Sequence, residues 1–209
     1  MLTPYRQHGL SLIETMAVVV IMGIVMAMAV PNFGPWITGT RIRSTAEGLL
    51  AGLQYAKSEA TTRNTQVRFQ LTTSLGADCK RSTTGGNWVV DVVDADADTD
   101  SVEGQCNSTP DGTAAPSILQ LRAASETGSN VSVSAEADQI IFNGLGRQAP
   151  VDVKKPVSPV AIDITPAAGG GTCATKTGGG KVTCLRILVS ATGQVRMCNP
   201  KLSDDPQAC

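Results

Sequence analysis

The residues of this sequence with the most evident chemistry are six cysteines. Their number is even, none forms a CxxC pair, and the chain has a single histidine, His8. This pattern fits disulfides better than a metal site or a thiol active centre, and disulfides predict a domain outside the cytoplasm. Sequence alone does not choose among the possible pairings. The simplest scheme joins nearest neighbours: Cys79 with Cys106, Cys173 with Cys184, and Cys198 with Cys209.

Catalytic chemistry is not indicated. His8, near the start of the chain, is the one imidazole, the cysteines are expected in disulfides, and no carboxylates are paired by spacing. Lys181 follows a run of glycines but precedes Val182, so a phosphate-binding loop is not formed. We predict a protein that is not an enzyme and has no cofactor.

Alternating aspartates offer a weak candidate for calcium. Asp94, Asp96 and Asp98 resemble the first ligands of a calcium loop, but the glycine of the sixth position is replaced by Thr99. No glutamate stands at the twelfth position. A solvated acidic turn is the favoured interpretation, and no other metal site is predicted.

Glu14 is a carboxylate near the start of an apolar run that extends from Leu10 to Val30. The run matches the roughly 20 residues that cross a bilayer. A charge at the bilayer centre costs about 3 kcal/mol, so its position needs a physical cause. We expect Glu14 to pair with a group of another subunit; the alternative is an ordinary charge that snorkels to the membrane interface.

A conventional secretory signal is a rival interpretation of this segment. Residues 27–29 (Ala-Met-Ala) offer a small-x-small cleavage site that would leave Val30 at the new N-terminus. The charge of Glu14, the length of the apolar run and a helical pattern beyond the cut all weigh against this interpretation.

Gly9 followed by Leu-Ser-Leu-Ile-Glu resembles the signal of type IV prepilins and type II secretion pseudopilins. The resemblance implies that a prepilin peptidase cuts between Gly9 and Leu10, that Leu10 is N-methylated, and that Glu14 acts in subunit assembly. Pro31 falls where the family commonly has a helix-bending proline. After cleavage a neighbour's Glu14 would neutralise the amino group of Leu10 and set the register between subunits.

Beyond this segment a second helical pattern begins. Pro31 and Pro35 each remove a backbone donor, so we expect the helix to kink or loosen there and then to resume. Apolar residues then recur at spacings of three and four and predict a packed amphipathic half. These residues are Ile42, Ala46, Leu49, Leu50, Leu53, Ala56 and Ala60.

The rest of the chain predicts short strands. Alternation of apolar and polar residues indicates a half-buried strand over 66–72, and further strands are expected over 88–93, 118–121, 131–133, 139–142, 160–165, 185–189 and 195–198. Two strands directly after a helix favour an antiparallel sheet laid on that helix.

The strand at 139–142, with the glycine-rich turn that follows it, and the C-terminal ending around Arg196 resemble the GspH/FimT branch of minor pilins and pseudopilins, which includes FimU. This resemblance implies an α+β, type IV pilin-like fold, with a long N-terminal helix against antiparallel sheets, stapled by disulfides. The apolar half of the helix would protrude and the amphipathic half would pack. The expected parts are a cleaved leader (1–9), a transmembrane and pilus-core helix (10–37) and a periplasmic or extracellular GspH-like domain (38–209).

Three functions follow from the resemblance. The leading one is a minor pilin that initiates or caps a type IV pilus and contributes to DNA uptake. The others are a competence pilin that captures extracellular DNA and a minor pseudopilin of a type II secretion system. Only the second arginine of the family's DNA-binding element is kept, as Arg196, and the candidate cations are Arg196, Arg186, Lys201, Arg147 and Lys181.

The expected partners are other pilins, the prepilin peptidase, the inner membrane before assembly and, as a further candidate, double-stranded DNA. The expected location is a single pass in the inner membrane, followed by the fibre. The formal net charge of −1 gives no global attraction to nucleic acid, so any DNA site would be local.

Overall fold

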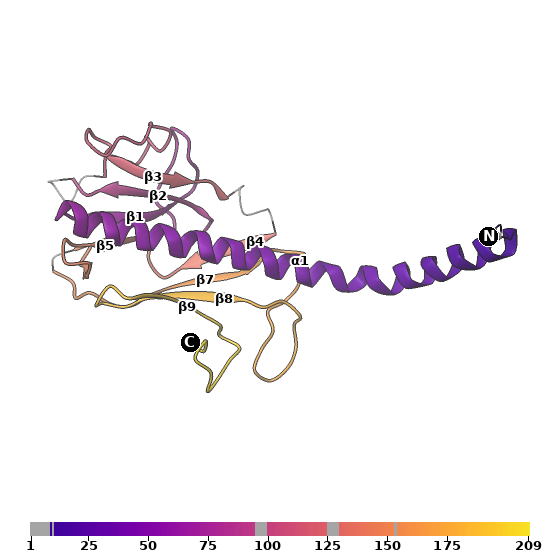
Figure 1. The fold of residues 1–209 in the computed structure, drawn as a ribbon. Helices are drawn as coiled ribbons and strands as arrows, with labels where there is room; N and C mark the ends of the chain where they lie inside the picture. Colours follow the sequence, from indigo (N-terminus) through magenta and orange to yellow (C-terminus); the bar gives the residue numbers. More distant parts are fainter. Residues whose placement is uncertain (1–8, 10, 95–99, 125–129, 153) are drawn as a thin grey trace, which may run out of the picture.

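One long helix organises the protein. The computed structural model describes residue 9 and residues 11–209 apart from 95–99, 125–129 and 153, without the side chains of residues 28–32. Helix α1 (Leu12–Arg63) has 52 residues; its C-terminal half lies on the domain and its N-terminal half extends away from it (Figure 1). Asn64 ends the helix in the left-handed conformation, with its N–H bonded to the carbonyl of Ala60.

Helix α1 runs through Pro31 and Pro35 without interruption, so the expected break, after which the helix would resume, is not formed. Figure 1 shows the protruding half as a gradual curve. A missing N–H removes one hydrogen bond without ending a helix whose flanking turns are intact. A kink centred on Pro31 stays a prediction.

The packed half of α1 buries the predicted apolar stripe. Thr38 is the first buried side chain among those described in α1, and its hydroxyl donates to the carbonyl of Gly34 at 3.1 Å. Leu50 is partly buried and the other six stripe residues are fully buried. Burying such side chains contributes about 1.5–3 kcal/mol each for the larger ones, which makes this stripe the main attachment of the helix.

Two antiparallel sheets lie against α1 (Figure 1). The first has the order β3-β2-β1-β5-β6 and the second the order β4-β7-β8-β9. The strands of the first sheet are β1 (Val67–Thr72), β2 (Asn87–Val92), β3 (Ile118–Arg122), β5 (Gln139–Phe142) and β6 (Gln148–Ala149). Those of the second are β4 (Val131–Ala135), β7 (Val160–Pro166), β8 (Leu185–Val189) and β9 (Val195–Cys198).

The predicted α+β class is confirmed, and every predicted strand has a counterpart. One main core joins the buried stripe of α1 to both sheets, and Phe69 and Trp88 lie beside each other in it with ring centroids 5.5 Å apart. The structure forms three disulfides: Cys79–Cys106, Cys173–Cys184 and Cys198–Cys209, the nearest-neighbour pairs.

Strand β1 differs from its predicted half-buried state, because all six of its residues are buried. One face packs on α1, and the segment 100–106 lies over the other, where Asp100 pairs with Arg68 and the Cys79–Cys106 disulfide ties the segment to the residues after β1. A second small core lies on this covered face, formed by Cys79, Val89, Val102, Cys106 and Ile118.

Candidate functional site

The start of α1 presents Glu14 and an uncovered apolar surface. Ser11 caps the helix, with its hydroxyl oxygen accepting from the N–H of Glu14 at 3.4 Å. Glu14 therefore lies in the first turn, where a carboxylate is favoured by the helix dipole. Gly9 is exposed, and Leu10, the predicted cleavage and methylation residue, lies outside the described residues.

The apolar side chains on either side of Glu14 are not covered by any part of the chain that the structure describes. Leu12 is 79% exposed. More than half of the surface of each of four further side chains is exposed as well: Met16, Val19, Ile21 and Met26. Water-exposed apolar surface on this scale marks a contact with other molecules. The predicted protruding half is therefore confirmed.

No helix in the described part of the chain is both long and apolar enough to cross a membrane. Residue 10 and the side chains of residues 28–32, which belong to the predicted span, lie outside that part.

The second sheet carries two of the candidate cations on the face turned away from α1. Arg186 of β8 is paired in register with Cys198, and Leu188 with Arg196 of β9. Residues opposite each other in an antiparallel pair share a face, so Arg186 and Arg196 lie on the same side of the sheet. Lys201 and Lys176 line a groove together with Arg186 on this side.

Both arginines already have partners. The guanidinium of Arg186 donates to the two carboxylate oxygens of Asp163 at 2.7 and 2.9 Å, and this bonding raises the pKa of Arg186. Arg196 donates to the main-chain oxygens of Ala208 and Cys209 at 3.3 and 3.4 Å. Arg196 thus contacts the tail that the Cys198–Cys209 disulfide ties back.

The remaining two candidate cations lie elsewhere. Gly193, in the turn between β8 and β9, packs so closely on Arg147 that an added Cβ would be 2.9 Å from the Cα of Arg147. Lys181 lies before β8, at the opposite end of this hairpin, in a groove beside α1. The five candidate cations are therefore not on one face, because Arg147 and Lys181 occupy the two ends of the hairpin.

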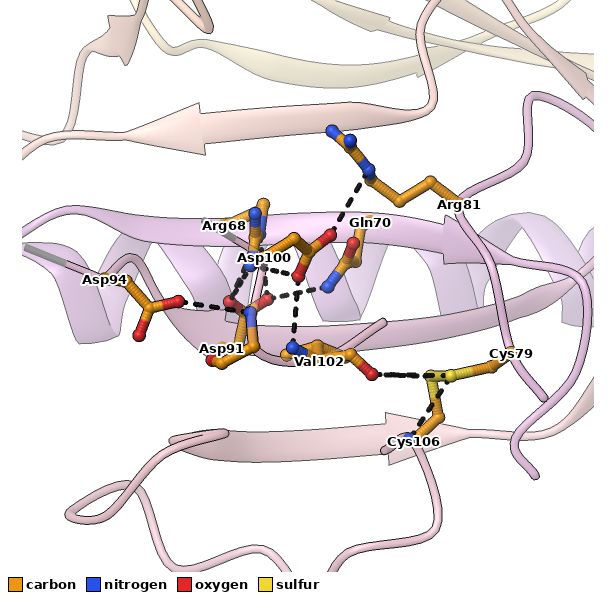
Figure 2. Close-up of polar contacts among 10 residues, drawn as sticks. Arg68, Gln70, Cys79, Arg81, Asp91, Asp94, Asp100, Val102 and Cys106 are labelled. Carbon is orange, nitrogen blue, oxygen red and sulfur yellow. Dashed lines mark hydrogen bonds and ion pairs between the residues drawn. A yellow bond between two sulfur atoms is a disulfide. The ribbon is translucent and has the colours of Figure 1, made fainter. Parts of the chain in front are cut away.

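The most strongly charged cluster was not predicted from the sequence. Arg68 of β1 and Asp91 of β2 are direct partners in register, and their side chains are 3% and 0% exposed (Figure 2). The guanidinium of Arg68 donates to Asp91 at 2.7 Å and to Asp100 at 2.7 Å. Gln70 donates to Asp91 at 3.2 Å, and Arg81 pairs with Asp100 at 3.2 Å.

This cluster corrects the expectation of a wholly solvated acidic turn. Asp100, at the end of that turn, lies between Arg68 and Arg81 with its side chain 9% exposed, and it also accepts the N–H of Val102 at 3.2 Å. Burial raises the pKa of Asp91 to about 7, against the lowering effect of Arg68. The signal available in the sequence was an aspartate inside the apolar run 88–93, opposite an arginine in the preceding strand.

Of the three candidate calcium ligands, only Asp94 belongs to the part of the chain that the structure describes. Asp94 accepts the N–H of Ser101 at 3.2 Å, and Asp96 and Asp98 lie outside the described residues. Among the residues that are described, no group of three or more His, Cys, Asp or Glu side chains is placed to hold a metal ion.

The fold and the N-terminal segment define a pilin-like α+β protein with an uncovered apolar helix. The model of the family described as type II transport protein GspH matches residues 45–193, and that of the prokaryotic N-terminal methylation motif matches residues 4–30. The chain therefore belongs to the GspH family, a family of structural pilins and pseudopilins. The methylation motif marks it as a membrane-anchored pilus or pseudopilus component.

Two solved structures are similar in fold. The type IV minor pilin FimU of Pseudomonas aeruginosa (strain PAO1) has 14% identity and a TM-score of 0.47, with 78% of this chain and 92% of that chain covered. The solution structure of E. coli GspH has 15% identity and a TM-score of 0.43, with 81% and 95% covered. Likenesses at this level do not bear on function. No match was found among curated proteins.

Proposed function

We propose that this protein is a minor pilin of a type IV pilus, in which α1 enters the helical core of the fibre and the disulfide-bonded domain faces outwards. The observation that most supports this function is the apolar half of α1, which is exposed from Leu12 onward and has Glu14 in its first turn. Before assembly the same segment crosses the inner membrane once. A prepilin peptidase cuts after Gly9, and Leu10 becomes the N-methylated N-terminus.

Glu14 sets the register between subunits. Cleavage creates a cation at Leu10, and in a water-free fibre core a neighbour's Glu14 is its partner. Removing one member of such a buried pair leaves the other uncompensated, which costs about 3–5 kcal/mol. Incorporation then falls by more than about tenfold, since 1.4 kcal/mol corresponds to a factor of ten.

The test compares Glu14→Ala with Glu47→Ala in sheared surface fibres. Glu47 forms an exposed pair with Arg43 on the packed half of α1, so its loss leaves assembly intact. Circular dichroism checks that the domain stays folded in both variants. Wild-type incorporation of the Glu14→Ala protein would overturn the proposal.

The choice of a pilus over a type II secretion pseudopilus is supported by the three disulfides. A surface-exposed fibre gains more from such cross-links than one confined to the periplasm. Recovery of the protein from extracellular fibres supports the pilus. A secretion defect on deletion of the gene, with normal fibres, identifies the pseudopilus instead.

A second role, capture of extracellular double-stranded DNA, is supported by the cations on the outer face of the second sheet. Lys176, Arg186 and Lys201 line one groove there, and DNA is bound mainly through its phosphates. The pairing of Arg186 with Asp163 reduces the free charge, so this role is secondary. A gel shift at low salt with the fragment from Thr38 onward tests it: no shift, or a shift unaffected by salt and by Arg196→Ala, removes this role.

A further inference from the structure

A groove of about 760 Å³ opens where α1 leaves the domain. Trp36, Thr40 and Arg43 of the helix form one wall, and Lys181, Thr183 and Asn199 belong to the opposite side. Trp36 is 69% exposed, and its neighbours Phe33 and Ile37 are exposed as well. The groove therefore combines an uncovered indole with cations and hydrogen-bond donors.

The position of this groove along α1 is defined by the apolar run. A fully helical run of 21 residues, the length of the apolar run, spans about 31 Å at 1.5 Å per residue, close to the hydrocarbon thickness of a bilayer. Trp36 then lies about 9 Å beyond the run, since α1 is continuous through this region. The head-group layer occupies about 5–8 Å on each side of the hydrocarbon, so Trp36 lies at its outer boundary.

The residues at this level fit a phospholipid head group. Tryptophan prefers the membrane interface because its ring is apolar and its N–H is polar. Lys181 is exposed and forms no salt bridge with any residue that the structure describes. Arg43 is bound to Glu47 at 2.9 Å, so of these two cations in the groove lining, Lys181 is the one without a salt bridge to a described residue.

We propose that this groove binds the phosphate head group of an anionic phospholipid and so seats the domain on the membrane surface before assembly. The proposal rests on the membrane-anchored stage of the proposed function. Cations at this depth attract anionic lipids, and the indole ring lies beside the head groups, above the acyl chains. The bound lipid fixes the depth at which α1 awaits its neighbours.

Fluorescence tests this proposal because Trp36 is exposed while the other tryptophan, Trp88, is 2% exposed in the core. The full chain is reconstituted in vesicles of phosphatidylcholine with and without phosphatidylglycerol, using lipids brominated at shallow or deep acyl positions. We expect shallow bromines to quench Trp36 more than deep ones, and phosphatidylglycerol to increase the quenching. Trp36→Phe provides the blank for Trp88.

Two charge variants separate the groove from general attraction. Lys181→Glu should reduce the preference for phosphatidylglycerol about fivefold or more. Each basic residue near an anionic surface increases the affinity for that surface by about this factor. Lys154→Glu makes the same charge change at an exposed loop outside the groove and should leave the preference unchanged. Equal effects of the two variants, or quenching that is independent of lipid charge, would overturn the proposal.

Other outcomes locate the failure. Absence of the chain from floated vesicles would refute the membrane stage and the lipid site together. Shielding of Trp36 in fibres but not in vesicles would assign the groove to a neighbouring subunit and refute the lipid site alone. If the Glu14→Ala protein is excluded from fibres but keeps the quenching pattern, the lipid site does not depend on the role of Glu14 in fibre assembly.

Discussion

Arg68 holds together the covered face of the first sheet. It is buried, and its guanidinium compensates two carboxylates that come from different parts of the chain, Asp91 of β2 and Asp100 of the covering segment. Burying three charges is costly unless each is paired, and this geometry pairs each of them. Arg68 therefore joins the sheet to the segment that covers it.

Arg68→Met should destabilise the protein strongly, because it leaves Asp91 buried without its cation. We expect a loss of about 3–5 kcal/mol in the free energy of unfolding, measured by urea denaturation in detergent. Arg43→Met removes an exposed pair with Glu47 and should cost less than about 1 kcal/mol. Similar losses for the two variants would contradict the structural role of Arg68.

The pKa of Asp91, raised by burial to about 7, predicts a pH dependence of stability. The usual pKa of aspartate is about 3.9, so between about pH 4 and pH 7 the folded state binds more protons than the unfolded state. The contribution of Asp91 to stability therefore falls as the pH rises through this window and is constant above it.

Comparison with Asp91→Asn isolates that contribution, since asparagine does not titrate. The melting temperature of the wild type relative to the variant should fall from pH 4 to pH 7. A difference between the two proteins that is independent of pH, or that grows in favour of the wild type, would show that the pKa of Asp91 is not raised.

At the scale of the elements, the Cys79–Cys106 disulfide determines whether residues 100–106 stay on the sheet. Both cysteines are buried in the second core, and the sequence separation of 27 predicts a stabilisation of about 3.5 kcal/mol. Replacing both by alanine should cost this amount. Hydrogen exchange should also accelerate at the amide of Val102, which is bonded to Asp100.

The matched control replaces Cys198 and Cys209, which hold the tail near Arg196. This change should leave exchange at Val102 as in the wild type. Exchange at Val102 that responds to both changes alike would mean that the covering segment does not depend on its own disulfide.

The contact between α1 and the first sheet depends on a missing side chain. A Cβ on Gly52 would lie 2.9 Å from the Trp88 ring and 3.0 Å from Phe69. Gly52→Ala should therefore destabilise the protein by about 1–3 kcal/mol, although alanine is the better helix former.

Gly39→Ala is the control for helix propensity, because nothing lies within 4 Å of its added Cβ. It should be neutral or stabilise by up to about 1 kcal/mol in thermal unfolding. Stabilisation by Gly52→Ala as well would mean that the helix does not pack closely on Trp88.

How far the sequence predicts these elements depends on where their contacts lie. The stripe of α1 and the strands follow from local periodicity, so these were predictable. The cysteine spacing gave the nearest-neighbour disulfides only as the simplest of several possible pairings. One face of strand 66–72 was predicted to be exposed but is buried. Its cover comes from residues 100–106, a contact that no local pattern encodes. The separation of Arg147 from Lys181 likewise depends on the β8–β9 hairpin and not on spacing along the chain.

At the scale of the whole molecule, one continuous helix serves two environments. Its packed half shares the core of both sheets, and its protruding half exposes apolar side chains with Glu14 at their start. Nothing in the described domain covers that half, so its stable state requires a membrane or other subunits. The groove at Trp36 lies at the junction between the two halves.

We propose that the chain enters a fibre through the apolar half of α1 after cleavage at Gly9. The decisive measurement is intact-mass and N-terminal analysis of the protein, both extracted from membranes and recovered from sheared fibres. In both fractions the protein should begin at an N-methylated Leu10. A protein that begins at Val30 would have been cleaved by a conventional signal peptidase and would lack Glu14, which rules out entry through this segment.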